Sequence, residues 1–391
     1  MSAGRQSTRF LLLYALAWAG GTIAYMPLLT VLLPVRVAAL AGEASVGWLA
    51  YLAFAGAIAA SLANVACGWL SDLYGGRRLW IAAGMVITCA LLPWFDHAAT
   101  FAQLLGLLIA WQVSLNLMLA PMAALAGDCV PDAQKGTLGG MLAFAPAAGA
   151  AAGTLVTFPG IAGPEGRLII VAVLVCLAVL PILLIGRPHL APLPRHQQSA
   201  APPTAPDRQH PVVRMWFARL LVQVSEAALF AFLYLWLRSL DPNFDDATTA
   251  RLFLVVLAVG APVALITGRW ADRTQQPLRP LRITALLAAS GLLVMALGPG
   301  VYVALAGYVL FTLATGVFLS LHSAQTLRVL RRSDRRGRDL GFFNLTNTVP
   351  SLVMPWLTLA LVPQLGFAAL FAALAVLGVG AAILLATIAS R

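Results

Sequence analysis

The chain has 391 residues, of which 61% are hydrophobic and only 10% are charged, and its mean hydropathy is +0.88. Soluble domains carry about 25% charged and about 45–50% apolar residues, so this composition excludes a water-soluble globular protein and indicates a polytopic membrane protein. The formal net charge is +11, but the arginines lie in the gaps between apolar runs, as the positive-inside rule predicts, which argues against nucleic-acid binding.

Long apolar runs follow one another along the whole chain. A helix needs roughly 20 mostly apolar residues to span a bilayer, and a count by that length predicts about twelve spans. The first run is longer than the roughly 7–15 apolar residues of a signal peptide, so we expect it to be an uncleaved membrane helix. The first six helices are predicted near 10–33, 46–70, 79–95, 101–124, 138–158 and 167–186, and the second six near 213–239, 250–271, 281–299, 301–323, 340–361 and 365–388.

The two sets of runs are separated by a segment rich in Pro, Ala and Gln, a composition typical of a mobile linker. We therefore predict an all-α membrane protein with twelve transmembrane helices, made of an N-terminal six-helix half (1–186), a cytoplasmic linker (187–212) and a C-terminal six-helix half (213–391). The arginines gather on one side of the membrane if both termini are cytoplasmic. The predicted location is the bacterial cytoplasmic (inner) membrane.

A short charged turn connects the second and third apolar runs. It reads Gly68-Trp-Leu-Ser-Asp-Leu-Tyr-Gly-Gly-Arg-Arg78, and about 200 residues later a second copy, Gly268-Arg-Trp-Ala-Asp-Arg273, follows the eighth run. The glycine allows close helix packing, and the aspartate can cap or pair with a nearby helix end. The repetition at half-chain spacing indicates a duplicated transporter with parallel repeats.

On these residues the chain resembles the major facilitator superfamily over essentially its whole length. Leu73 and Gly76 stand where that family usually has basic residues, and Gln275 replaces the second glycine in the repeated turn. The resemblance implies the twelve-helix fold and a loop that latches the cytoplasmic side in the outward-facing state. By this resemblance, the residues of the conformational latch are Gly68, Asp72, Gly75, Arg77, Arg78, Gly268, Asp272 and Arg273.

Three further stretches suggest subgroups. Residues 121–128, followed by Lys135-Gly136, and residues 341–350 are similar to glycoside and sucrose–cation symporters. That resemblance implies a role for Asp128 in proton or cation coupling. Ala145-Pro-Ala-Ala-Gly149, with Gly153, loosely resembles the glycine–proline motif of drug–proton antiporters, although Ala145 stands where that motif expects glycine.

Two carboxylates are candidates for proton coupling. An ionisable residue at membrane depth costs about 2.5–3.5 kcal/mol on insertion scales, so we expect each one to have a structural or functional role. Glu226 lies midway along the seventh run, on the helix face of Gln223 and Arg219, and can bind and release a proton there. The structural alternative for Glu226 is an ion pair with Arg219, and for Asp128 a capping or gating pair with a basic loop residue.

Polar and aromatic residues on the apolar helices are candidates for a substrate cavity. Amides and aromatic faces suit a polyhydroxylated solute. Buried amides can instead hold helices together at about 0.6–2 kcal/mol each, and for any single residue this structural role is the simpler reading. The candidates are Tyr14, Trp18, Tyr25, Tyr51, Asn64, Trp111, Gln112, Asn116, Gln223, Tyr234, Tyr308, His322, Asn344 and Asn347.

The sequence shows no metal-ligand cluster, nucleotide-binding loop or hydrolase motif, so we expect no cofactor and no enzyme activity. The expected partners are a small-molecule substrate, a proton or other cation and the lipid bilayer, with the chain acting as a monomer. The predicted function is proton-coupled uptake of a small neutral solute such as a sugar or glycoside. The alternatives are proton-coupled export of an amphipathic compound and a non-transporting membrane protein that holds a partner complex.

Overall fold

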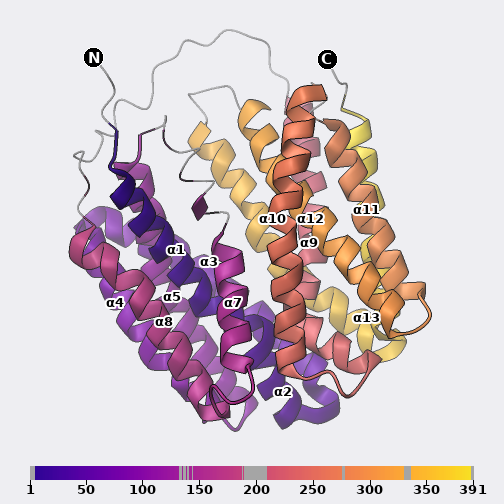
Figure 1. Cartoon of the computed structure of the whole chain (residues 1–391), viewed down its shortest axis with the longest axis horizontal. Coiled ribbons are helices and arrows are strands. Elements are labelled where there is room, and N and C mark those ends of the chain that lie inside the picture. The colour runs from indigo at the N-terminus through magenta and orange to yellow at the C-terminus, as the bar shows by residue number, and fades with distance from the viewer. Residues whose placement is uncertain are drawn as a thin grey trace. The chain divides into compact units, whose positions relative to one another are not determined.

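The computed structural model describes residues 5–131, 134, 138, 141–142, 144–186, 188, 209–274, 278–329 and 336–388. The described elements are helices, as predicted (Figure 1). The chain forms two compact units, and the residues of each unit lie close together in space. Unit 1 contains residues 1–195 and 244–254, and unit 2 contains residues 196–243 and 255–391.

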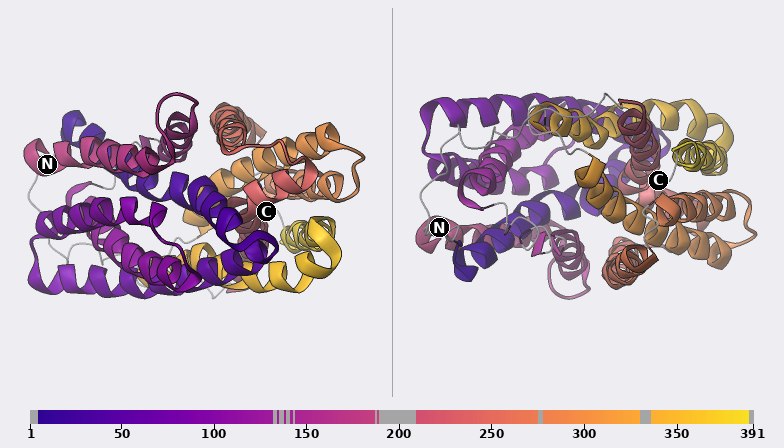
Figure 2. Two further views of the ribbon diagram at one scale, coloured as in Figure 1. Left: turned by 90° about the horizontal axis from the view of Figure 1, so that it is seen from below. Right: turned by 90° about the horizontal axis from the view of Figure 1, so that it is seen from above.

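Unit 1 is a bundle of helices that lie side by side (Figures 1 and 2). Local signals begin them: the Ser7 side chain accepts a hydrogen bond from the Phe10 N–H to cap the first helix, and Thr100 with Gln103 forms a capping box. A π-helical turn follows Pro27, where Pro34 offers no N–H to the preceding turn. The helices are α1 (Thr8–Pro27), α2 (Leu33–Ala41), α3 (Ser45–Tyr74), α4 (Arg77–Leu91), α5 (Phe101–Cys129), α7 (Ala145–Thr157) and α8 (Pro164–Ile185).

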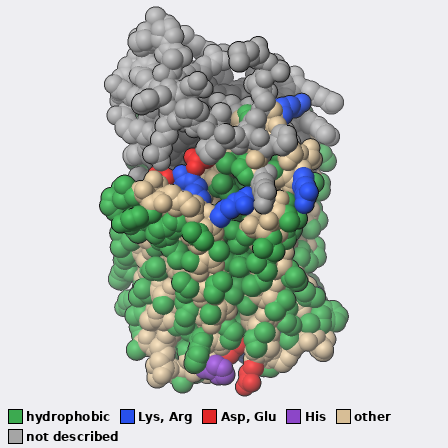
Figure 3. Space-filling view, turned by 90° about the vertical axis from the view of Figure 1, so that its left-hand side faces the viewer, with side chains coloured by type: hydrophobic (Ala, Val, Ile, Leu, Met, Phe, Trp, Pro, Cys, Tyr) green, Lys and Arg blue, Asp and Glu red, His purple; other side chains and the backbone are tan. Residues whose placement is uncertain are grey.

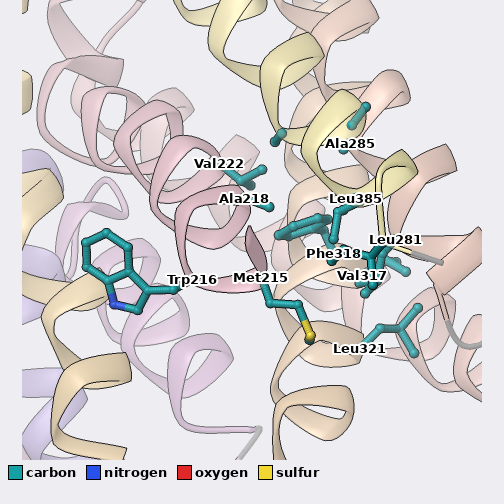
Figure 4. Packing of buried hydrophobic residues seen from close by; sticks show 13 residues of the cluster. Met215, Trp216, Ala218, Val222, Leu281, Ala285, Val317, Phe318, Leu321 and Leu385 are labelled. Carbon is teal, nitrogen blue, oxygen red and sulfur yellow. The ribbon is translucent and has the colours of Figure 1, made fainter. Parts of the chain in front are cut away.

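Unit 2 is built from α9 (Gln209–Leu240), the larger part of α10 (Asp246–Thr274), α11 (Leu278–Leu297), α12 (Val301–Val329) and α13 (Arg336–Ala386). Four of these helices, α9, α11, α12 and α13, contribute side chains to one apolar core cluster. Figure 4 shows Phe318, Val317, Leu281 and Leu385 gathered in this cluster, with Trp216 projecting from the other side of α9. Non-helical backbone at Gly366, with φ 74°, divides α13 into two helices.

Nine helical stretches in the described ranges are long and apolar enough to cross a membrane. One of them, Thr8–Tyr74, covers two of the predicted runs, and Val349–Ala386 contains the Gly366 break between two more. These helices agree with a polytopic membrane protein, whereas the exact number of twelve spans and the cytoplasmic termini stay predictions. The fifth predicted run, 138–158, overlaps α7, whose bounds are shorter.

The outward surface of unit 1 matches a lipid environment. Leu79, Val86, Leu177 and Leu184 are exposed large apolar side chains on α4 and α8. Figure 3 shows a broad belt of hydrophobic side chains on this face, with basic and acidic side chains toward one end and acidic and His side chains at the other. A patch of this size is typical of a membrane-facing surface.

The first residues of α10 group with unit 1, and the predicted division at the linker stays a prediction. Asp246 forms an ion pair with Arg167 at the start of α8. The Thr154 hydroxyl donates to the Ala250 carbonyl oxygen at 3.1 Å, and the Arg251 guanidinium lies 5.5 Å from the centre of the Phe158 ring. These three contacts explain why residues 244–254 group with α7 and α8.

One glycine in each unit allows two neighbouring helices to pack backbone to backbone. A Cβ on Gly84 of α4 would lie within 2.8 Å of backbone atoms of Leu117 and Met118 on α5. About 200 residues later, a Cβ on Gly291 of α11 would lie 2.6–2.9 Å from backbone atoms of Gly307 and Phe311 on α12. The same packing solution at equivalent places in the two units agrees with a duplicated chain.

We expect Gly84→Ala to lower the thermal stability of the detergent-solubilised protein, by about 1–3 kcal/mol in the free energy of unfolding, because the added methyl group meets backbone that cannot move alone. The matched control is Gly106→Ala on α5, where a Cβ would meet nothing within 4 Å. Melting curves of the two variants measure the difference. Equal melting temperatures would show that the α4–α5 approach does not depend on this glycine.

Candidate functional site

Glu226 lies near the middle of α9, on the face that also carries Gln223 and Arg219. The Arg219 Nε donates to Gln223 Oε1 at 3.0 Å and to Thr346 Oγ1 of α13 at 3.1 Å. Arg219 and Gln223 are half-buried, whereas Glu226 is exposed on the surface of unit 2. Arg219 is also the charged group that acts electrostatically on Glu226. The structure thus gathers a cation, an amide, a hydroxyl and a carboxylate on neighbouring helices.

His322 of α12 packs behind this face. Its side chain is fully buried, its Nε2 lies 2.9 Å from the Met215 carbonyl oxygen of α9, and its ring lies 5.5 Å from that of Phe318. These contacts make His322 a link between α9 and α12 within the apolar core. This arrangement corresponds to the structural alternative for a buried polar residue.

The charged turn after α3 is organised around Arg77. The Arg77 Nη2 lies 2.7 Å from Asp72 Oδ1 on α3, and its Nε lies 2.5 Å from Asp128 Oδ2 at the end of α5. Its Nη1 donates to Ser71 Oγ at 3.1 Å, and that hydroxyl donates to the Gly68 carbonyl at 2.8 Å. Arg77 therefore ties the end of α3 to the end of α5.

Two adjacent glycines make the turn possible. Gly75 has φ 66° and Gly76 has φ 65°, a backbone region that residues with a side chain rarely adopt. The turn delivers Arg78 to the end of α8, where its Nη2 donates to the Gly186 carbonyl. The two neighbouring arginines thus reach two different helix ends.

Gly268, Asp272 and Arg273 belong to α10, but their side chains lie outside the described residues. The side chains of Asn344 and Asn347 on α13 also lie outside them. The assignments of these five residues stay predictions.

Four of the eight predicted cavity residues of unit 1 are buried in the helix packing: Tyr14, Trp111, Gln112 and Asn116. Tyr14 is buried, and its hydroxyl donates to the Met122 carbonyl at 2.9 Å. Asn64 Nδ2 donates to Asn116 Oδ1 at 3.0 Å, which joins α3 to α5, and Asn116 donates in turn to the Gln112 carbonyl. The amide pair thus has the interhelical role that was the alternative to substrate binding.

The remaining candidates of unit 1 have different surroundings. Trp111 is fully buried, and its ring lies 6.2 Å from that of Phe95. Trp18 stacks on Tyr14 with ring centres 6.3 Å apart and is half-buried. Tyr25 is half-buried and Tyr51 is exposed. Of this set, Trp18, Tyr25, Tyr51 and Asn64 retain accessible surface.

In unit 2, both candidate tyrosines are buried. Tyr234 accepts a hydrogen bond from Arg238 Nη1 at 3.1 Å, one turn further along α9. The Tyr308 ring lies 5.9 Å from that of Trp236, in an aromatic group that also includes Phe371. Both tyrosines pack the bundle, which leaves Gln223 as the accessible candidate among the described side chains of this unit.

Sequence reasoning missed two polar groups. Thr346 stands between Asn344 and Asn347, so the polar stretch on an apolar helix was a usable signal for it. Gln6 and Gln134 form a reciprocal pair: Gln6 N–H donates to Gln134 Oε1 at 2.6 Å, and Gln134 Nε2 donates to the Gln6 carbonyl at 3.1 Å. Both glutamines are buried, and no local pattern connects two residues so far apart in the chain.

We expect Arg77→Gln to loosen the junction between α3 and α5 and to raise the rate at which a hydrophilic maleimide labels Cys129, which is buried at the end of α5. The two carboxylates that pair with Arg77 are about one-third exposed or more. We therefore expect the substitution to lower the free energy of opening this junction by about 1 kcal/mol, which raises the population of the open form about fivefold. Mass spectrometry of the labelled peptide measures the rate. Arg78→Gln is the matched control, because Arg78 contacts α8; equal effects of both substitutions would contradict the specific tie.

Comparison with known proteins places these features in a family. The human organic anion transporter MFSD10 (TETRAN) has a similar structure, with a TM-score of 0.70 at 15% identity over 96% of this chain and 99% of that one. A bacterial homologue of the human lysosomal transporter Spinster, in an inward-facing and unoccupied conformation, gives 0.65 at 14% identity over 97% and 93%. No curated protein sequence matches the chain. The family model named Major Facilitator Superfamily matches residues 10–333, and the chain therefore belongs to this superfamily of multi-pass membrane transporters.

Proposed function

We propose that the protein is a proton-coupled secondary transporter that works by alternating access, with Glu226 as the group that carries the proton. The single observation that supports this role is the position of Glu226: an exposed carboxylate near the middle of α9, on the same face as Arg219 and Gln223. A carboxylate at membrane depth is expensive to keep without a function. A surface open to water or substrate at that depth gives it a way to exchange protons.

Asp128, the other candidate, has a different environment. It lies at the end of α5, next to the residue that closes the helix, and its carboxylate is held by Arg77. An ion pair at a helix end supports a gating role, which was the structural alternative for this residue. We therefore propose that Asp128 belongs to the latch and that proton coupling does not require it.

The substrate is proposed to be a small amphipathic organic compound. A sugar needs many neutral hydrogen-bonding groups, whereas Tyr14, Asn116, Tyr234 and His322 are buried and already bonded within the protein. The resemblance to glycoside and sucrose symporters stays a prediction. The structural relative MFSD10 is described as an organic anion transporter, which adds support for the amphipathic alternative.

We expect Glu226→Gln to reduce substrate-driven proton flux in proteoliposomes to the level of protein-free vesicles, because an amide cannot bind and release the proton. Asp128→Asn is expected to retain coupled flux at an altered rate. The assay uses an entrapped pH-sensitive dye and a panel of disaccharides and amphipathic compounds of each charge. Glu43→Gln, in the exposed turn after α2, is the matched control.

Coupled flux that survives in Glu226→Gln would sink the assignment of this residue. Flux lost in Asp128→Asn alone would transfer the role to Asp128. A response to disaccharides with no response to amphipathic compounds would restore the sugar hypothesis.

A further inference from the structure

Two cysteines of unit 1 meet where α4 packs against α8. The Cys176 thiol donates a hydrogen bond to Cys89 Sγ, with 3.7 Å between the two sulfurs. The Cys89 thiol donates in turn to the Ala172 carbonyl oxygen at 3.5 Å, and Ala172 lies about one helical turn before Cys176. Both cysteines are free thiols. The two helices therefore hold a dithiol whose sulfurs are already in contact.

Contacts on both sides of this dithiol fix the register of the two helices. Arg78, at the start of α4, donates to the carbonyl of Gly186, which directly follows α8. The 3₁₀ turn Leu92–Asp96, which follows α4, packs on α8, and Arg167 near the start of α8 acts electrostatically on the aspartate of that turn. The two helices are therefore antiparallel, and a shift of one helical turn between them would break the contacts at both ends. This register places the two thiols opposite each other.

The dithiol lies on a side of the bundle that faces lipid. Cys89 and Cys176 are half-buried. Val86 lies three residues before Cys89, and Val173 and Leu180 lie three residues before and four residues after Cys176, and all three side chains are exposed. Residues three or four apart share a helix face, so the exposed surface continues to the sulfurs. Molecules dissolved in the lipid can therefore reach the thiols.

A second thiol at contact distance decides what oxidation produces. A hydroperoxide oxidises a cysteine to a sulfenic acid, which condenses with a neighbouring thiol to a disulfide. A reaction partner that is held in place reacts far faster than a dissolved one. Condensation is therefore favoured over further oxidation to the sulfinic acid, which is irreversible in most proteins.

We propose that Cys89 and Cys176 form a peroxide-sensitive dithiol, which a lipid-soluble hydroperoxide converts to a disulfide between α4 and α8. The sulfur of one thiol attacks the O–O bond of the hydroperoxide ROOH: an S–O bond forms, the O–O bond breaks, and the alcohol ROH leaves with the thiol proton. The second thiol then attacks the sulfenic sulfur: an S–S bond forms, the S–O bond breaks, and water leaves with the second thiol proton. The dithiol loses two electrons, and the hydroperoxide is reduced to an alcohol and water.

The disulfide stabilises unit 1 by joining two of its helices. An S–S bond is about 2.0 Å long, so the sulfurs must approach by about 1.7 Å, which draws α4 and α8 together. The bond closes a long loop of the chain that contains α5 and α7. A cross-link across a long loop removes many conformations from the unfolded chain and so favours the folded one.

The test uses purified, reduced protein in proteoliposomes, exposed to equal concentrations of cumene hydroperoxide, which dissolves in lipid, or hydrogen peroxide, which dissolves mainly in water. Thiol alkylation, digestion and mass spectrometry then show which cysteines have reacted. Cumene hydroperoxide is expected to remove both free thiols and to give two peptides joined through Cys89 and Cys176, which a reductant separates. Hydrogen peroxide is expected to give this product more slowly. The oxidised protein is expected to melt at a higher temperature than the reduced protein.

Variants test each thiol by itself. Cys89→Ser and Cys176→Ser are each expected to lose the joined peptides and the rise in melting temperature, and to leave on the remaining thiol a sulfenic acid that dimedone traps. The matched control replaces with serine the other two cysteines, Cys67 and Cys129, which are buried in α3 and α5. This double variant is expected to form the disulfide as the unmodified protein does. Size-exclusion profiles check that each variant is folded.

Several outcomes would overturn the proposal. These are free Cys89 and Cys176 thiols after exposure to both peroxides, sulfinic acids in place of the disulfide, a disulfide between two copies of the protein, or joined peptides that contain Cys67 or Cys129. A faster reaction with hydrogen peroxide than with cumene hydroperoxide would reject access through the lipid. An unchanged melting temperature after complete oxidation would reject the stabilising role of the bond.

Discussion

The cost of placing an ionised group inside an apolar helical bundle constrains the whole molecule. The chain meets this constraint in two ways. At helix ends, charges are paired with each other or with carbonyl groups, as Arg77 is with Asp72 and Asp128 and as Arg78 is with the Gly186 carbonyl. Within α9, Arg219 and Glu226 share one face near the middle of the helix. The pairs at helix ends stabilise the structure, whereas the α9 face with Arg219 and Glu226 is the arrangement that a transport cycle can use.

The neutral framework around these charges is built by close helix packing. Gly84 and Gly291 let neighbouring helices approach backbone to backbone in the two units, and the Asn64–Asn116 amide pair joins α3 to α5. In unit 2 the helix that carries Arg219 and Glu226 contributes Met215, Ala218 and Val222 to the apolar cluster with α11, α12 and α13. This packing holds α9 in place, which matters because the proposed proton carrier lies on that helix.

The sequence predicted the helices and the first charged turn well, because both depend on local signals. Apolar run length defines the helices, and Gly75 and Gly76 mark a turn whose positive φ angles favour glycine. It also made Glu226 a candidate, because a lone carboxylate in an apolar run is conspicuous in any single sequence. Helix periodicity placed Arg219 and Gln223 on one face of the helix, and their side chains are hydrogen-bonded to each other.

What the sequence could not give was the partner of each polar group across helices. For Tyr14 and Asn116 the sequence left a cavity role and an interhelical role open, and their partners are the Met122 carbonyl and Asn64 on other helices. For Asp128 it left a coupling role and a gating pair open, and the structure pairs this carboxylate with Arg77. The attachment of the start of α10 to unit 1 through the Arg167–Asp246 pair also has no local signal. Such pairings depend on tertiary packing.

The most direct test of the central claim is infrared difference spectroscopy of the protein in lipid, recorded between high and low pH. The account predicts a band from a protonated carboxyl group that appears as the pH falls and is missing in Glu226→Gln but present in Asp128→Asn. The same titrating band in Glu226→Gln would contradict the claim that Glu226 carries the proton.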